Sequence, residues 1–197
     1  MIILADNDIV HKLACCELLD SFLEWIESPP AVVWVIPSIP FVLRKKLKNN
    51  PTALACLEAF LLKTRPIPEA SIDLLERYEQ LDEGERQMLA VLVEDQRITR
   101  LVTGDKRALR QFAGMVSGDA PLSSRLSQTR TDCLESVMLG LMDHFGYPVI
   151  NGKASLGVDS DKVLKMTFGP ARSEAHAREV LGVYLKELQD DVNFMNA

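Results

Sequence analysis

The sequence predicts an α/β protein with a three-layer α/β/α architecture, in which helices cover both faces of a parallel sheet of about four strands. A helical C-terminal extension is expected to follow the sheet. Two observations lead to this prediction. Short, continuous apolar runs, typical of strands buried on both faces, alternate with segments whose apolar residues have helical spacing. Strands that alternate with helices pair in parallel, because each helix returns the chain to the same end of the sheet.

Three apolar runs are expected to form the main strands. Each is short enough for a strand and rich in Ile, Leu or Val. Ser28-Pro29-Pro30 separates the second run from the helix expected before it. The expected strands are residues 1–5, 31–36 and 98–103, with a small edge strand at residues 114–117.

Capping residues and prolines mark the starts of the expected helices. Asp8 is expected to cap the first helix, which keeps its apolar spacing as far as Phe22. Asn50 followed by Pro51 is typical of an N-cap with a proline at the first helical position. The helices expected in this part of the chain are residues 8–22, 38–48, 50–63, 68–78, 82–94 and 105–112.

The composition becomes polar at residues 119–127, which predicts a linker. We therefore divide the chain into an α/β domain at residues 1–118 and a helical extension at residues 119–197. No strand is expected in the extension. Its predicted helices are residues 132–145, which Gly146 ends, residues 159–168, and residues 173–192, which Ser173 caps.

Composition and charge limit the possible partners and compartments. The 197 residues carry a net charge of −6, which argues against tight, non-specific binding to nucleic acid. No apolar stretch is long enough to span a bilayer, and the first residues lack the basic leader of a signal peptide. The four cysteines show no CxxC spacing, which is typical of reduced thiols. We expect a cytoplasmic protein without a membrane partner.

Acidic residues follow the predicted strands and open one of the helices. Asp6 and Asp8 follow the first strand, and Asp105 follows the strand at residues 98–103. Asp82 and Glu85 stand at the start of a helix. Ligands of open parallel sheets bind beyond the carboxyl ends of the strands. Carboxylates that converge there would suit a hard cation such as Mg²⁺ or Mn²⁺.

Each acidic cluster also has a purely structural interpretation. Asp82 and Glu85 have the spacing of a helix capping box, although Gly84 between them is a poor helix former. Asp105 could simply cap the helix that it precedes. Both interpretations remain open from the sequence alone.

Taken in order, these motifs resemble those of PIN-domain nucleases over residues 1–118. The first strand ends in Asp6 with Asp8 two positions later, Leu81-Asp82-Glu83-Gly84-Glu85 opens a helix, and Thr103-Gly104-Asp105 follows a strand. The resemblance implies a metal-dependent ribonuclease that acts on single-stranded RNA and binds Mg²⁺ or Mn²⁺. It implies Asp6, Glu85 and Asp105 as catalytic metal ligands, with Asp8 and Asp82 as further ligands. The phosphate contacts would be Thr103, Lys106, Arg107, Lys45 and Lys46.

The chain departs from the family pattern at one position. A further acid usually comes from the helix after the second strand, but there is no acidic residue between Glu27 and Glu58. A non-catalytic PIN-like interaction or regulatory protein is therefore an alternative. Its helical extension would hold a protein partner or form a homodimer.

A second alternative is a phosphatase of the haloacid-dehalogenase type. Asp6-x-Asp8-x-Val10 resembles the nucleophile motif of that family, in which the first Asp attacks phosphorus. Leu109 stands where a second late Asp would be expected.

Overall fold

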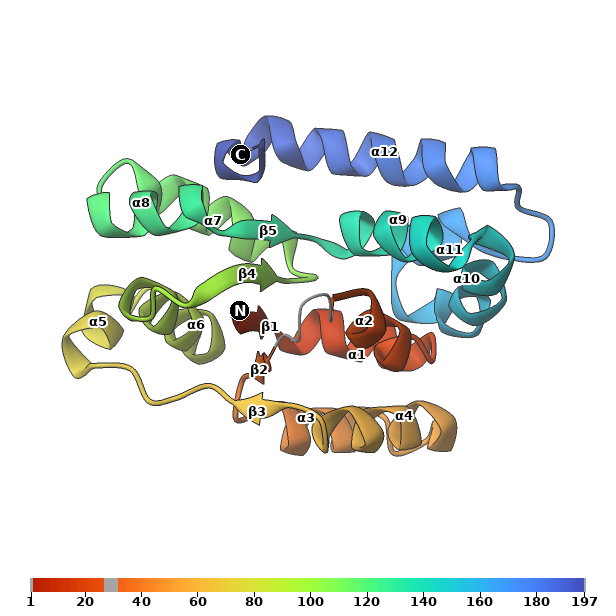
Figure 1. Cartoon of the computed structure of the whole chain (residues 1–197), viewed down its shortest axis with the longest axis horizontal. Coiled ribbons are helices and arrows are strands. Elements are labelled where there is room, and N and C mark those ends of the chain that lie inside the picture. Colours follow the sequence, from red (N-terminus) through yellow and green to blue (C-terminus); the bar gives the residue numbers. More distant parts are fainter. Residues whose placement is uncertain (1, 27–31, 197) are drawn as a thin grey trace.

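A five-stranded parallel sheet lies at the centre of the computed structural model, which describes residues 2–26 and 32–196 (Figure 1). The prediction of a mixed α/β protein with a parallel sheet is confirmed. Its strand order is β3-β2-β1-β4-β5, so the first strand in the sequence is the central one. The strands are β1 (Ile2–Ala5), β2 (Val32–Val35), β3 (Arg65–Pro66), β4 (Ile98–Val102) and β5 (Arg130–Asp132).

Helices pack on both sides of this sheet (Figure 1). The helices of the first half are α1 (Asn7–Cys15), α2 (Leu19–Ile26), α3 (Ile39–Lys46), α4 (Pro51–Leu61), α5 (Ile72–Arg77) and α6 (Glu83–Glu94). Those of the second half are α7 (Lys106–Val116), α8 (Ala120–Gln128), α9 (Leu134–Phe145), α10 (Tyr147–Ala154), α11 (Lys162–Thr167) and α12 (Glu174–Asp191). Short 3₁₀ helices, η1 (Ser155–Ser160) and η2 (Asn193–Asn196), follow α10 and α12.

The first predicted helix is broken into two helices. Asp6, and not Asp8, caps α1, and the chain turns at Glu17, whose φ is +54°. Cys16 and Phe22 remain buried on either side of the turn. The apolar spacing continues through the break, and for this reason the sequence pattern did not predict two separate helices. The stop expected at Ser28-Pro29-Pro30 lies outside the described residues.

The predictions for residues 114–117 and 119–127 are wrong. The edge strand expected at residues 114–117 is helical, because α7 continues to Val116. The linker expected at residues 119–127 forms α8, whose N-cap Asp119 accepts a hydrogen bond from the Leu122 N–H at 2.9 Å. Asp119 also accepts one from the buried hydroxyl of Tyr78 at 3.1 Å. The polar residues of this segment thus cap and cover a packed helix.

The extension also contains a strand, contrary to the prediction. β5 pairs with β4, so the sheet continues beyond residue 118. A buried ion pair links β5 to β4: Asp132 is 2% exposed and lies 2.5 Å from Arg100 Nε on β4. Asp132 also lies 3.1 Å from Nε of Arg130, a largely exposed residue of β5 itself. The Arg100 guanidinium stacks 4.2 Å from the centre of the Trp25 ring. An ion pair, and not an apolar pattern, therefore specifies this strand.

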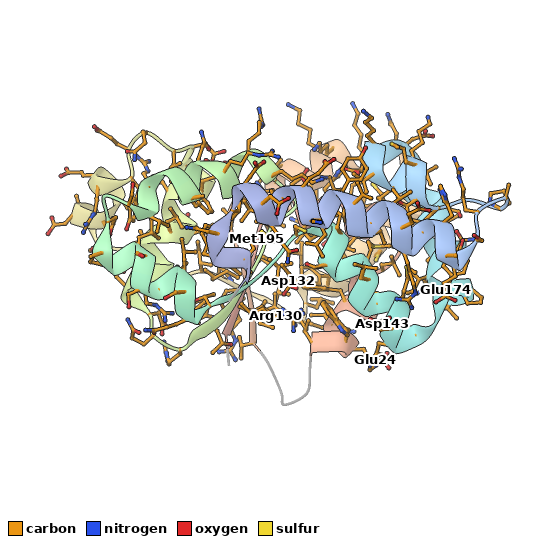
Figure 2. All side chains as sticks on the ribbon, turned by 90° about the horizontal axis from the view of Figure 1, so that it is seen from above. Glu24, Arg130, Asp132, Asp143, Glu174 and Met195 are labelled. Carbon is orange, nitrogen blue, oxygen red and sulfur yellow. The ribbon has the colours of Figure 1, made fainter. Side chains whose placement is uncertain are left out.

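The outer side of β5 is covered by the end of the chain. Figure 2 shows Arg130 and Asp132 close to Met195, which follows α12. α12 itself begins after Ser173, whose hydroxyl accepts a hydrogen bond from the His176 N–H at 3.2 Å, as predicted. None of the helices formed by residues 2–26 and 32–196 is long and apolar enough to cross a membrane.

Candidate functional site

The five acidic side chains singled out in the sequence line one pocket of about 140 Å³. The pocket lies where β1 and β4 end and where α1, α6 and α7 begin. Parallel strands place these helix starts at one edge of the sheet, as expected. The lining residues are Asp6, Asn7, Asp8, Ile36, Ser38, Asp82, Gly84, Glu85, Met88, Asp105 and Ala108.

Asp6 is the most deeply buried of these acids, with 7% of its surface exposed. Its Oδ1 accepts hydrogen bonds from the Ile9 N–H at 2.8 Å and the Gly104 N–H at 3.4 Å. Its Oδ2 accepts a hydrogen bond from the Thr103 hydroxyl. Burial, reinforced by the negative charge of Asp8, outweighs these hydrogen bonds and raises the Asp6 pKa to about 6. Asp6 is thus held in place by hydrogen bonds, but these do not offset the cost of burying its negative charge.

Asp82 and Glu85 form the capping box that their spacing indicates. Asp82 Oδ1 accepts from the Glu85 N–H at 2.9 Å, and Glu85 Oε2 accepts from the Asp82 N–H at 3.3 Å. Gly84 has a packing role, because a Cβ there would lie 3.1 Å from Ile36 Cδ1. Burial raises the Glu85 pKa, and the negative charges of Asp82 and Asp105 raise it further. The structural interpretation of this motif is therefore confirmed, since the capping box forms, and both of its acids line the pocket.

Asp105 caps α7 and faces Arg107. Its Oδ1 accepts from the Arg107 N–H at 2.8 Å and the Ala108 N–H at 3.3 Å, and its Oδ2 lies 3.5 Å from the Arg107 guanidinium. The Arg107 side chain is 88% exposed. Together with Gln111, Asp82 and Glu85 it lines a neighbouring hollow of about 200 Å³. Arg107 is therefore an exposed positive charge at the rim of the acidic pocket.

Asp8 has a cationic partner that the sequence analysis missed. Lys12 Nζ lies 2.5 Å from Asp8 Oδ2, 2.8 Å from Asp161 Oδ2 and 3.2 Å from the carbonyl oxygen of Gly104. The spacing of Asp8 and Lys12, four positions apart on a helix, is typical of an ion pair and could have revealed this contact. Nothing in the sequence pattern indicates that Asp161 joins it.

The predicted phosphate contacts are distributed unevenly around the pocket. Thr103 lies against Asp6, and Arg107 lies beside Asp105. Lys106 points elsewhere: its Nζ lies 2.5 Å from the fully buried Glu135 and 4.7 Å from the centre of the Tyr184 ring. Lys45 and Lys46 lie on the exposed face of α3 and do not line the pocket.

The oxygen atoms that line the pocket are ligands of the type that Mg²⁺ or Mn²⁺ prefers, but they are not arranged as a metal site. All the charged donors are carboxylate oxygens, and Asn7 Oδ1, also at the pocket, is buried without a hydrogen-bond partner. However, no three Asp, Glu, His or Cys side chains in the described part of the chain are grouped closely enough to hold a metal ion. Glu85 would have to leave its capping box to join Asp6 and Asp105.

Comparisons with protein-family models, with curated proteins and with solved structures find no match to this chain.

Gly104 is required for the close approach of α1 to the end of β4. A Cβ at this position would lie 2.5 Å from Asp8 Oδ2 and 3.0 Å from the Ile9 nitrogen. We expect Gly104→Ala to lower the free energy of unfolding by about 1–3 kcal/mol, measured by urea denaturation, because the backbone of α1 must move. Gly114→Ala is the matched control on α7: nothing lies within 4 Å of its Cβ, so it should increase stability by up to about 1 kcal/mol. Equal effects of the two substitutions would contradict this role for Gly104.

Proposed function

We propose that this chain is a PIN-like ribonuclease with a three-layer α/β/α domain, which uses Mg²⁺ or Mn²⁺ to hydrolyse phosphodiester bonds in single-stranded RNA. The observation that supports the proposal most directly is the shared pocket of Asp6, Asp8, Asp82, Glu85 and Asp105. These acids come from three separate segments of the chain. Helix capping explains why single acids stand at helix starts, but it does not require three such starts to share one pocket.

Electrostatics also favours a bound cation. Burial is the main cause of the raised pKa values of Asp6 and Glu85, and repulsion from neighbouring carboxylates raises both further. Such a pocket repels a phosphodiester, which is itself negatively charged, unless positive charge is added. A divalent ion would supply this charge, polarise a phosphate oxygen and lower the pKa of a bound water.

The residues of the chain have distinct roles in this proposal. Asp6, Glu85 and Asp105 would hold the ion, and Asp82 would be released together with Glu85 when the capping box opens. Thr103 orients Asp6 through its hydroxyl. Arg107 can leave Asp105 at little cost, since exposed ion pairs contribute about 0–1 kcal/mol. Its guanidinium would then bind the phosphate backbone.

The test is cleavage of labelled single-stranded RNA by the purified chain in Mn²⁺. We expect Asp6→Asn and Asp105→Asn each to reduce the cleavage rate by about a hundredfold or more. Asp159→Asn is the matched control, because Asp159 is 88% exposed and does not line the pocket. Cleavage that persists in the Asp6→Asn, Asp105→Asn double variant, or in excess chelator, would refute the proposal. A phosphomonoester substrate in parallel tests the phosphatase alternative.

The capping box and the Asp8–Lys12 pair favour a second candidate, a non-catalytic PIN-like interaction protein. Both contacts satisfy the acids within the chain itself. A protein partner, or a second copy of the chain, would then bind through the C-terminal helices, which expose Val149 and Val183. Calorimetry that detects no divalent metal, together with no turnover of either substrate, would support this candidate.

A further inference from the structure

Lys12 is a buried cation at the edge of the acidic pocket. It lies on α1 with 9% of its surface exposed, and its ammonium group has three acceptors: Asp8 Oδ2, Asp161 Oδ2 and the Gly104 carbonyl. A lysine ammonium has three N–H donors and accepts nothing. All three donors are therefore in use, and Lys12 cannot bind a substrate phosphate without losing one of these contacts.

The charge of Lys12 is maintained by its two carboxylate partners. Its Nζ lies 2.5 Å from Asp8 Oδ2 and 2.8 Å from Asp161 Oδ2. Two carboxylates beside one ammonium group stabilise its charged form. Lys12 is thus paired on both sides inside the protein.

The positions of both carboxylates that contact Lys12 depend on the local backbone. Asp161 is the N-cap of α11, and its Oδ1 accepts from the Val163 N–H at 2.6 Å and the Leu164 N–H at 3.2 Å. This leaves Asp161 Oδ2 facing Lys12. On the other side, the missing Cβ of Gly104 makes room for Asp8 Oδ2. The ammonium position is therefore determined by the starts of two helices.

We infer that Lys12 is a positioning residue for the pocket: it acts as the permanent counter-ion of Asp8, withholds that carboxylate from metal binding and limits the pocket to one divalent cation. This inference rests on the proposed metal-dependent function, which it deepens. It explains why Asp8 lines the pocket but is already paired.

The number and affinity of bound Mn²⁺ ions test the inference. Calorimetry and electron paramagnetic resonance should find one Mn²⁺ per chain in the wild type. Lys12→Met removes the positive charge and releases Asp8, so it should bind a second ion or bind the first about tenfold more tightly. Lys12→Arg is the matched control, because it keeps the charge and should bind one ion at the affinity of the wild type.

A third variant tests whether a loss of stability alone, without a loss of the Lys12 charge, changes ion binding. Asp161→Asn keeps the Lys12–Asp8 pair and should lower the melting temperature without changing the number of bound ions. The Mn²⁺-dependent rise in melting temperature gives a second readout for Lys12→Met, because a ligand that binds the native state stabilises it.

Each outcome decides a different claim. If the wild type binds one ion and Lys12→Met binds it equally well, the counter-ion role is refuted while the metal site stands. If neither protein binds Mn²⁺, both are refuted. If Lys12→Met binds and the wild type does not, the counter-ion role is supported and the metal-dependent function of the native chain is refuted.

Discussion

Replacing Asp6 with asparagine is expected to increase the free energy of unfolding at pH 7 by about 1–3 kcal/mol. Burial raises the Asp6 pKa from 3.8 to about 6, so the folded state carries an unfavourable buried charge at neutral pH. Asparagine is an equally good N-cap, and its oxygen can still accept from the Ile9 N–H. Its amide nitrogen can donate to the Thr103 hydroxyl. The same substitution should abolish RNA cleavage if the proposed function holds.

The pH dependence of stability gives an independent measurement. Because the folded pKa of Asp6 lies above the unfolded value, the folded chain holds the proton more tightly between pH 3.8 and about 6. The contribution of Asp6 to stability is therefore greatest below this window and falls as the pH rises through it. Urea denaturation at several pH values should show that Asp6→Asn removes this decrease. An Asp6→Asn protein that is less stable than the wild type at pH 7 would contradict the argument.

Replacing Asp132 with alanine is expected to lower the free energy of unfolding by about 3–5 kcal/mol. Arg100, 8% exposed, would lose its carboxylate partner and keep a buried charge, and its Nη2 already lacks a hydrogen-bond partner. Stacking on Trp25 would remain, but it cannot replace a buried ion pair. Thermal and urea denaturation would measure the loss.

Arg130→Ala is the matched control for this ion pair. The Arg130 side chain contacts the same carboxylate but is 62% exposed, so its removal should cost about 1 kcal/mol or less. In addition, Arg100→Met combined with Asp132→Ala should recover part of the stability, because no unpaired buried charge remains. Equal losses in Asp132→Ala and Arg130→Ala would mean that burial of Arg100 does not determine the stability of β5.

The elements that the sequence predicted correctly are those with local signals. β1 and β2 have apolar runs, and β4 is a short segment rich in Ile, Leu and Val. Asn50 caps α4 by accepting from the Ala53 N–H at 3.1 Å, as its position before Pro51 indicates. β3 and β5 lack such signals. β3 has two exposed residues, and β5 is a polar segment whose buried Asp132 pairs with Arg100 on the neighbouring strand.

The same distinction applies to the candidate site. The acids could be identified because each follows a strand or opens a helix, which is a local pattern. The residues that pair with charged side chains around the pocket could not be identified in this way. Lys106 pairs with Glu135, and Lys12 pairs with Asp161, residues that are brought together only by packing of the second half of the chain. The electrostatic state of the pocket is therefore a property of the whole fold, even though its acids all lie before residue 106.

The contact between Lys12 and Asp161 has a consequence during synthesis on the ribosome. The central strand, β1, is translated before its second neighbour, β4, and Asp161 is translated later still. Until then one edge of β1 stays unpaired and Lys12 lacks one of its two carboxylates. Lys12 therefore gains its second carboxylate partner only after Asp161 has been translated, whereas all residues that line the acidic pocket are translated earlier.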